Sequence, residues 1–229
     1  MWATPWPSAP GSAGRARALR ELSLAVCALP WIGVLVLPLV ATSPDASRLG
    51  TLFAALLMGL PALLGTPRPL RRELFPFVMT ARMAAGTALA AGAVTSLHLC
   101  ATWITQRLWP FSAASLNALR HNFFPDSGAH LVLVLTTLLL VTPLMEEVFF
   151  RGVLRAQFAL SFPALRVPGP ALLFALLHGE ARNVPALFLL GLLLGFLRER
   201  SGSLAPCILV HAVVNAAGWW WLWRAASTL

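Results

Sequence analysis

The chain has 229 residues, of which 58% are hydrophobic and 11% are charged. Its mean hydropathy is +0.76. Soluble domains carry about 25% charged residues, so this composition excludes a water-soluble globular protein and indicates a membrane protein. The formal net charge of +9 comes from arginine alone, because no lysine occurs. The arginines lie singly or in small groups between apolar runs, which argues against nucleic-acid binding and is typical of charges that flank membrane helices.

Successive apolar runs predict an all-α membrane protein. Residues 1–20 are rich in Pro, Ala, Gly and Arg, and predict a flexible cytoplasmic lead-in. The run at 22–41 has about 20 residues, more than the roughly 7–15 of a cleaved signal peptide, so we interpret it as a retained first helix. Further runs follow at 49–65, 83–105, 129–150, 170–178, 185–197 and 204–223. Since a membrane helix needs about 20 apolar residues, we expect a polytopic transmembrane bundle of about seven helices, within a range of six to eight.

The fifth apolar run, at 170–178, is too short to cross a bilayer. Ala171 to His178 rise only about 12 Å as a helix, whereas the hydrocarbon core is roughly 30 Å thick. The polar stretch HGEARN and a second short run at 185–197 follow. We therefore expect a short hairpin whose tip ends within the protein or in a water-filled cavity, where irregular backbone is tolerated.

The distribution of arginine predicts the orientation. With a cytoplasmic N-terminus and seven alternating segments, 12 arginines fall inside and 5 outside. Cytoplasmic loops carry an excess of positive charge, so we expect the N-terminus inside and the C-terminus outside. The five outer arginines are Arg48, Arg107, Arg120, Arg182 and Arg224.

Ionisable side chains within membrane helices are costly and are functional candidates by default. Three groups stand out, namely Glu146, Glu147 and Arg151 in MEEVFFRG, Phe174 and His178 in FALLH, and His211 and Asn215 in HAVVN. With the rise of a helix, the groups lie about 7–12 Å from the predicted inner boundary. We therefore expect them to converge in one layer near the cytoplasmic face.

The spacing within each group has a structural meaning. Glu147 and Arg151 are i,i+4 neighbours and can pair on one helix face. Glu146 points about 100° away from Glu147 on a helix and has no obvious local partner. Phe174 lies one turn before His178 and can pack against the imidazole ring.

These residue types match the needs of amide hydrolysis. Glu146 and His178 could hold and deprotonate a water molecule. His211 and Asn215 share the i,i+4 spacing and could donate hydrogen bonds to the oxyanion. No serine or cysteine in the groups is a convincing nucleophile. The alternative for each group alone is structural, because buried ion pairs and interhelical hydrogen bonds also occur in membrane bundles.

A metal site is a further alternative. Two histidines and a glutamate could bind Zn²⁺, but no HExxH spacing occurs and neither histidine has a second histidine on its own helix. We therefore predict no metal and no other cofactor, with Zn²⁺ as the alternative.

The other unusual residues have simpler explanations. We expect structural histidines at His98, His121 and His130. An odd number of dispersed cysteines predicts no disulfide framework, and we expect small buried side chains at Cys27, Cys100 and Cys207. The tryptophans that end the last run indicate an aromatic belt at the outer interface. Gly191 and Gly195 form a GxxxG pattern that allows close helix packing.

The three motifs resemble those of the CAAX prenyl protease and bacteriocin-processing (CPBP) membrane proteases, also called Abi proteins or type II CAAX endopeptidases. The family pattern is EExxxR, then FxxxH, then HxxxN, and this chain has EEVFFR, FALLH and HAVVN in the same order. The likeness covers about residues 130–218, and residues 1–125 show no recognisable signature.

The resemblance implies an intramembrane endopeptidase whose helical bundle has a chamber open to the cytosol. It implies that Glu146 and His178 activate water and that His211 and Asn215 stabilise the oxyanion. The supporting residues would be Glu147, Arg151 and Phe174. Three regions follow, namely a lead-in at 1–20, N-terminal transmembrane helices at 21–125, and a CPBP-type catalytic core at 126–229.

The partners expected from this resemblance are the lipid bilayer and a peptide or protein substrate, such as a bacteriocin-like peptide, a lipid-anchored tail or a C-terminal sorting segment. We expect a multi-pass protein of the bacterial cytoplasmic membrane. The main rival is a non-proteolytic immunity or scaffold protein that binds a peptide partner. A transporter is less favoured because no repeat symmetry is visible.

Overall fold

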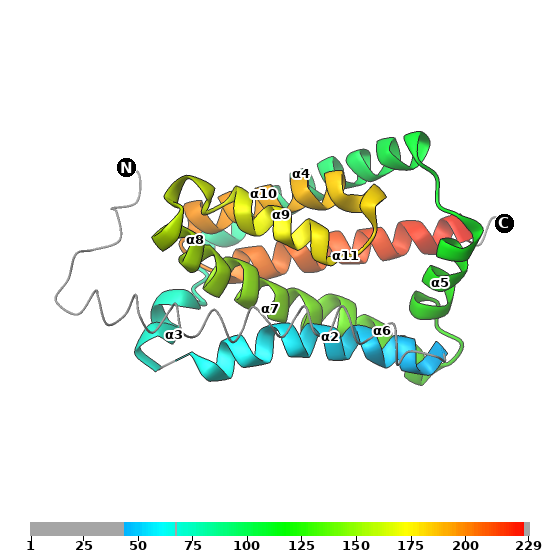
Figure 1. Ribbon diagram of the computed structural model, residues 1–229, viewed down its shortest axis with the longest axis horizontal. Helices are drawn as coiled ribbons and strands as arrows, with labels where there is room; N and C mark the ends of the chain where they lie inside the picture. Colours follow the sequence, from blue (N-terminus) through cyan, green and yellow to red (C-terminus); the bar gives the residue numbers. More distant parts are fainter. Residues whose placement is uncertain (1–43, 67, 227–229) are drawn as a thin grey trace.

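The computed structural model describes residues 44–66 and 68–226, so the predicted lead-in and first helix lie outside the described residues. Within these ranges the chain is helical and contains no β-strand, which confirms the predicted all-α fold (Figure 1). The longer elements are α2 (Pro44–Gly65), α3 (Arg68–Leu74), α4 (Ala81–Leu108), α5 (Ala113–Phe123), α9 (Pro168–Leu177), α10 (Val184–Ser201) and α11 (Ala205–Ala226).

One further helix runs from Gly128 to Ser161 and changes its hydrogen-bonding pattern along its length. Its α-helical parts are α6 (Gly128–Thr136), α7 (Thr142–Glu147) and α8 (Arg155–Ser161), and its π-helical parts are η1 (Thr137–Val141) and η2 (Val148–Leu154). Such π-helical turns are rare and often occur at functional sites. Here they stand on both sides of α7, which carries Glu146 and Glu147.

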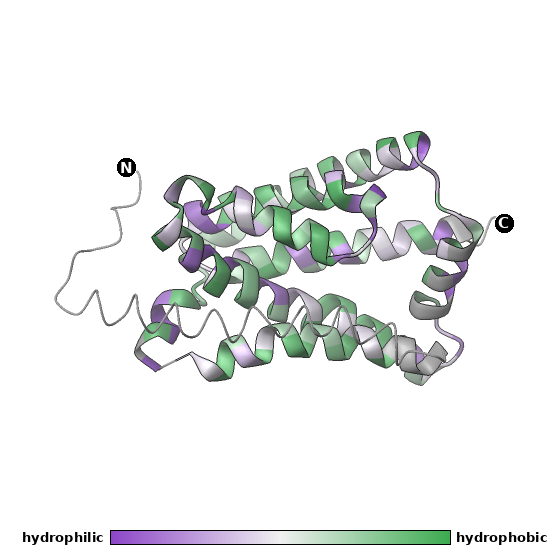
Figure 2. Ribbon diagram, in the orientation of Figure 1, coloured by the Kyte–Doolittle hydropathy of each residue, from purple (hydrophilic) through white to green (hydrophobic). Residues whose placement is uncertain are grey.

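Several of these helices can cross a membrane. Among the described residues, four stretches are long and apolar enough, namely Ala81–Leu108, Gly128–Ser161, Ala181–Ser201 and Ala205–Arg224. Shorter apolar helices cover Leu49–Gly65 and Pro168–Leu177. Apolar residues line the long helices, and α3 is largely hydrophilic (Figure 2). The protein is therefore a multi-pass membrane protein.

The long helices lie side by side, and the bundle has two distinct ends (Figure 1). We call one the α3 end, where the amide of Leu204 donates to the carbonyl of Pro76 at 2.8 Å and joins the segment after α3 to the start of α11. We call the other the α5 end, where the indole of Trp219 donates to the carbonyl of Phe123 at 2.8 Å. Helix α11 ends at the α5 end.

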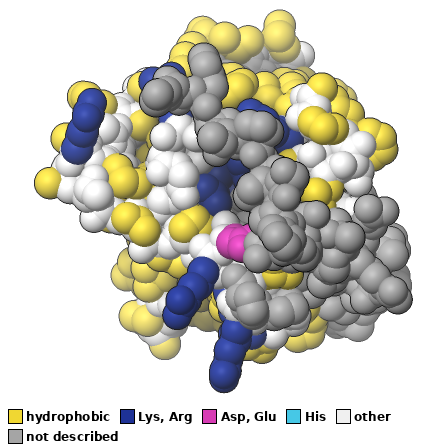
Figure 3. All heavy atoms as spheres, turned by 90° about the vertical axis from the view of Figure 1, so that its left-hand side faces the viewer, with side chains coloured by type: hydrophobic (Ala, Val, Ile, Leu, Met, Phe, Trp, Pro, Cys, Tyr) yellow, Lys and Arg dark blue, Asp and Glu magenta, His cyan; other side chains and the backbone are white. Residues whose placement is uncertain are grey.

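Arginine is unevenly divided between these ends. The arginines of α3, the start of α4, α8, the turn after α8 and the end of α10 lie at the α3 end, and several of them appear on its surface (Figure 3). The positive-inside rule therefore predicts that the α3 end is the cytoplasmic one, and the orientation stays a prediction.

The fifth and sixth apolar runs form a hairpin, but only α9 is short, because the second run belongs to the membrane-spanning stretch Ala181–Ser201. Helix α9 has only 10 residues and α10 has 18, and the tip between them stops short of the level reached by α4 and α11 (Figure 1). The two helices pack closely at glycines, as expected. A Cβ added to Gly191 would lie 2.9 Å from Ala171, and one added to Gly195 would lie 2.7 Å from Val167.

Candidate active site

A proline changes the local hydrogen bonding of the helix that carries the two glutamates. In η1, the amide of Thr142 donates to the carbonyl of Thr137, five residues back. The next donor in this π-helical pattern would be Pro143, which has no N–H. The carbonyl of Leu138 is therefore left without a helical donor. The Nδ2 group of Asn215 donates to it at 3.0 Å and so ties α11 to this helix.

Glu147 is the centre of a buried hydrogen-bond network. Its Oε1 accepts from Nη1 of Arg151 at 2.9 Å and from Nδ1 of His211 at 2.8 Å. Nη2 of Arg151 donates to the carbonyl of Gly191 at 3.1 Å. Glu147 is 0% exposed and Arg151 is 2% exposed. The predicted Glu147–Arg151 pair is thus confirmed, and it connects the glutamate helix to α10 and α11.

Glu146 lies beside the same imidazole without a hydrogen bond. Its Oε2 is 3.7 Å from Nε2 of His211, beyond ordinary hydrogen-bond length. This oxygen is buried and has no hydrogen-bond partner. Because Nδ1 of His211 donates to Glu147, the neutral imidazole carries its lone pair on Nε2, which faces Glu146. His211 therefore stands between two carboxylates.

His178 has its tautomer fixed by the backbone. Its Nδ1 lies 2.7 Å from the carbonyl oxygen of Phe174, and since a carbonyl can only accept, Nδ1 carries the proton. Nε2 is then free to accept a proton or a hydrogen bond. The Phe174 ring lies 4.7 Å from the His178 ring and 5.8 Å from the His211 ring, so the predicted packing of Phe174 on His178 is confirmed.

Phe174 also contacts the ion pair. The guanidinium carbon of Arg151 lies 4.8 Å from the centre of the Phe174 ring. One aromatic side chain thus touches members of all three motifs. Within the described residues, no hydrogen bond or ion pair joins His178 directly to Glu146, and the contact between their motifs passes through Phe174 and His211.

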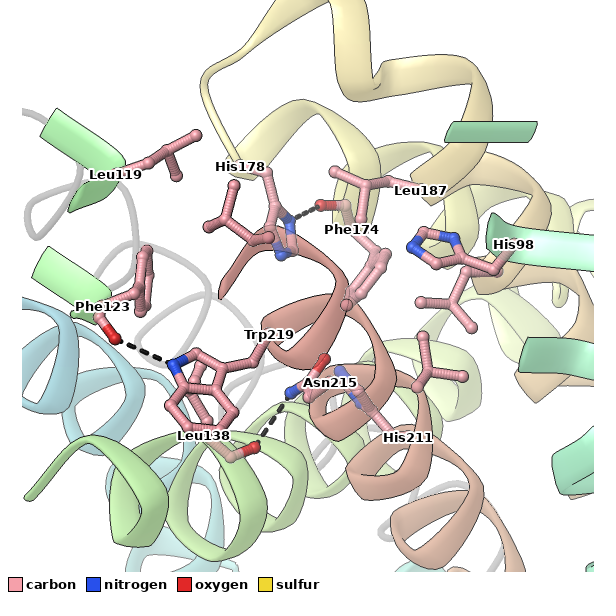
Figure 4. A pocket seen from close by; sticks show the side chains of 14 residues that line it. His98, Leu119, Phe123, Leu138, Phe174, His178, Leu187, His211, Asn215 and Trp219 are labelled. Atoms are coloured by element: carbon pink, nitrogen blue, oxygen red, sulfur yellow. Dashed lines mark hydrogen bonds between the residues drawn. The ribbon is translucent and has the colours of Figure 1, made fainter. Parts of the chain in front are cut away.

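A cavity of about 200 Å³ adjoins these residues. His178, His211 and Asn215 line it, whereas Glu146 does not. The wall continues to α5 and the end of α11 through Leu119, Phe123, Trp219 and Leu222 (Figure 4). The cavity therefore extends from the imidazoles toward the α5 end of the bundle.

The resemblance implies a chamber open to the cytosol. Under the orientation predicted from the arginines, such a chamber would extend toward the α3 end, whereas this cavity extends toward the α5 end. The tip of the α9–α10 hairpin contacts α5, because Arg182 donates to the carbonyl of Pro110 at 2.9 Å and to Oγ of Ser115 at 3.2 Å. Phe150 and Leu194, which do not line the cavity, are at most 1% exposed.

The helix that carries the glutamates extends beyond the apolar run of the sequence. Glu146 lies 18 residues after Gly128 and 15 before Ser161 in one continuous helix, and its depth in the bilayer stays a prediction. The apolar run at 129–150 ends before Arg151, but the helix continues through α8. It can do so because Arg151 pairs with Glu147 and Arg155 pairs with Glu199.

Sequence reasoning missed one lining residue. His98 of α4 lines the cavity together with His178 and His211 (Figure 4). Its Nδ1 lies 3.3 Å from the carbonyl of Ala186, so the expected structural bond exists, but it leaves Nε2 of the neutral ring as an acceptor. The sequence does contain a signal for His98, because it is a single ionisable residue in an apolar helix, and the three motifs were selected by the same criterion.

The other histidines stay outside the site. His130 is 6% exposed, and its Nδ1 lies 3.2 Å from Oδ1 of Asp126, which confirms a structural role. The side chain of His121 lies outside the described residues, as does Cys27. Cys207 is free and buried as expected, but Cys100 is exposed, because its side of α4 faces away from the bundle.

The terminal tryptophans have two different environments. Trp220 and Trp223 are 52% and 41% exposed and stack with ring centres 5.4 Å apart, as the aromatic belt predicts. Trp219 instead lines the cavity and bonds to α5. Its indole therefore helps to hold α5 over the α5 end of the cavity.

The choice between Zn²⁺ and metal-independent chemistry depends on whether the possible metal ligands lie together. Among the described residues, His, Cys, Asp and Glu form no group of three or more that could hold a metal ion. The shortest His–Glu contact, from His211 to Glu147, is a hydrogen bond between the two side chains. Metal-independent chemistry stays our prediction, with Zn²⁺ as the alternative.

Comparison with protein families gives one match. Residues 128–217 match the model described as type II CAAX prenyl endopeptidase Rce1-like. Neither the curated proteins nor the solved structures give a match. The matched segment begins with α6, ends within α11 and contains all three motifs, whereas His98 lies outside it.

Proposed function

We propose that the protein is an intramembrane endopeptidase, because residues 128–217 match the model described as type II CAAX prenyl endopeptidase Rce1-like. The observation that carries the proposal is the network in which His211 contacts both glutamates of the first motif while Phe174 contacts both imidazoles. Residues distant in sequence thus form one polar site, buried in an apolar bundle, beside a cavity.

We assign the activation of water to Glu146 and His178. Oε2 of Glu146 has no hydrogen-bond partner, and Nε2 of His178 is free because Nδ1 is held by Phe174. A water held by these two acceptors would lose a proton to one of them as its oxygen attacks the carbonyl carbon of the substrate. The products of that step are a tetrahedral intermediate and a protonated base.

We assign the stabilisation of the oxyanion to His211 and Asn215. One N–H of the Asn215 amide donates to Leu138, and the second is available to the oxyanion. Nε2 of His211 becomes a donor once it receives a proton, and Glu146 lies 3.7 Å away as the source. The same proton then passes to the leaving amine as the C–N bond breaks, which restores both residues.

Glu147 and Arg151 support this chemistry without touching the substrate. The carboxylate holds Nδ1 of His211 and so directs Nε2 toward Glu146. Arg151 compensates the charge of Glu147 and anchors it to the carbonyl of Gly191. In a site that excludes water, a preorganised hydrogen-bond donor stabilises the transition state more than a donor that must be ordered during the reaction.

The substrate we propose is a membrane-associated peptide segment, either lipid-anchored or a C-terminal sorting segment, in a bacterial cytoplasmic membrane. The cavity supports this class, because apart from three imidazoles and one amide its wall is mainly apolar and aromatic. Such a wall suits a hydrophobic peptide more than a charged one.

The test compares the C-termini of membrane proteins in cells that carry the wild-type chain and cells that carry Glu146→Gln. We expect a small set of proteins to keep their uncleaved C-termini only in the variant cells. Identical C-termini in both strains, with the variant present in the membrane at wild-type level, would instead support a non-proteolytic immunity or scaffold protein.

A further inference from the structure

Arg198 is a buried cation outside the proposed active site. It lies in the last turn of α10 and is 5% exposed. Its Nε is buried without a hydrogen-bond partner, and within the described ranges its guanidinium makes no hydrogen bond or ion pair. Buried charges in proteins are normally paired, and an unsatisfied buried group points to a water or ion that completes it.

The neighbouring carboxylate cannot supply this partner. Glu199 follows Arg198 directly, but its Oε1 accepts from Arg155 and its Oε2 lies 3.3 Å from Arg166. Both of its oxygens are therefore engaged. Arg155 and Glu199 both act electrostatically on Arg198, in opposite directions. Three arginines, Arg155, Arg166 and Arg198, thus lie near one glutamate, and this excess of positive charge favours an anion.

The position along the helix indicates where the anion comes from. The membrane-spanning stretch that contains α10 ends at Ser201, three residues after Arg198, or about 4.5 Å at the rise of a helix. Gly202, with φ of 65°, then ends the helix. Arg198 thus lies at the edge of the bilayer, at the level of lipid headgroups.

The chemistry of the side chain selects the ligand class. A guanidinium presents parallel N–H donors that match the oxygens of a phosphate. Anionic phospholipids are enriched at the cytoplasmic surface, and the α3 end, with its surface arginines (Figure 3), is the cytoplasmic end by the positive-inside rule.

We propose that Arg198 binds the phosphate of an anionic phospholipid headgroup at the α3 end, with the charge of the nearby Arg155 adding to the attraction. This site is separate from the peptidase proposal and does not depend on it. The lipid completes a guanidinium that the protein leaves unpaired. Bound lipid therefore stabilises the folded bundle.

The experiment measures thermal unfolding of the full chain in a zwitterionic detergent as phosphatidylglycerol is titrated in. A ligand that binds only the folded state raises the unfolding temperature with its concentration. We expect a rise for the wild type, and an apparent lipid affinity about tenfold weaker in Arg198→Gln. Arg200→Gln is the matched control, because it removes the same charge from the exposed side of the same turn, and it should respond like the wild type.

Two further titrations test which ligand the site binds. Phosphatidylcholine and inorganic phosphate should each give a much smaller shift than phosphatidylglycerol. A full shift with inorganic phosphate alone would mean a free-anion site and overturn the lipid assignment. Equal responses of Arg198→Gln and Arg200→Gln, or no response in the wild type, would overturn the site itself.

The unfolding temperature without lipid distinguishes lipid binding by Arg198 from a purely structural role of this residue. If Arg198 only stabilised the fold, Arg198→Gln would unfold at a lower temperature than the wild type without lipid. We expect it to be as stable or more stable there, because the variant no longer buries an unpaired charge. Should Arg198→Gln fail to fold, Arg198→Lys, which keeps the charge but loses the paired donors, should fold and bind the lipid more weakly than the wild type.

Discussion

Nδ1 of His211 lies 2.8 Å from Oε1 of Glu147, although 64 residues separate them in the chain. This contact fixes the imidazole so that Nε2 faces Glu146, the neighbouring carboxylate. Two adjacent glutamates on one helix thereby receive different roles. One holds and orients the imidazole, and the other keeps a free oxygen for proton transfer.

Loss of the proposed base should remove turnover but not the fold. Glu146→Gln keeps the shape of the side chain and should lower peptide turnover by about 10²–10⁴-fold, the usual size of a general-base effect. His178→Ala and His211→Ala should also abolish cleavage. Because residues that act as a unit are non-additive, a double variant should be little worse than a single one. Near-normal turnover of Glu146→Gln would refute the assigned mechanism.

The buried ion pair should behave differently from the base. Arg151→Ala leaves Glu147 buried without its cation and should destabilise the fold by about 3–5 kcal/mol, as well as lower activity. Thermal unfolding in detergent, measured beside turnover, separates the two effects, with Glu146→Gln as the control that loses activity alone. If Arg151→Ala were as stable as the wild type and inactive, Arg151 would belong to the catalytic or substrate-binding groups.

The effects of substituting Asn215 and Pro143 on the free energy of unfolding should be coupled, because both residues determine which group donates to the carbonyl of Leu138. Asn215→Ala leaves the oxygen of Leu138 without a donor, which should cost about 1–3 kcal/mol. In a Pro143→Ala background residue 143 regains an N–H, so the same Asn215→Ala change should cost less. Unfolding of the four proteins gives this coupling energy as a double-mutant cycle. Equal costs in both backgrounds would show that Pro143 is not the reason for the free carbonyl.

Gly191 should control the distance between α9 and α10. Gly191→Ala brings a Cβ to 2.9 Å from Ala171, so the helices must separate, and His178 at the end of α9 moves away from the network. We expect lower stability and lower turnover, both partly restored by Ala171→Gly. Gly92→Ala, with no atom within 4 Å of the added Cβ, is the matched control and should change neither.

His98 should affect substrate binding more than chemistry. Its free Nε2 faces the cavity but makes no contact with Glu146 or Glu147 among the described residues. We expect His98→Ala to raise KM with a smaller effect on kcat, the pattern of a lost binding contact. His130→Ala, in a buried histidine outside the cavity, should lower stability and leave KM unchanged. A loss confined to kcat would place His98 in the reacting layer instead.

The sequence alone determined everything that depends on spacing within one helix. The i,i+4 pairing of Glu147 with Arg151 and the stacking of Phe174 on His178 follow from the helical period, and the short α9 follows from the length of its apolar run. The order of the three motifs was enough to indicate the family whose model residues 128–217 match.

Only the tertiary structure decided which motifs meet and where the cavity extends. The period of a helix says nothing about its rotation or its shift along a neighbour. Those were set by close contacts such as Gly191 with Ala171 and by the π-helical turns, each of which changes the direction of later side chains. As a result His211 faces the glutamates, Asn215 is tied to Leu138, and His98 joins the cavity from a helix whose sequence carries no motif.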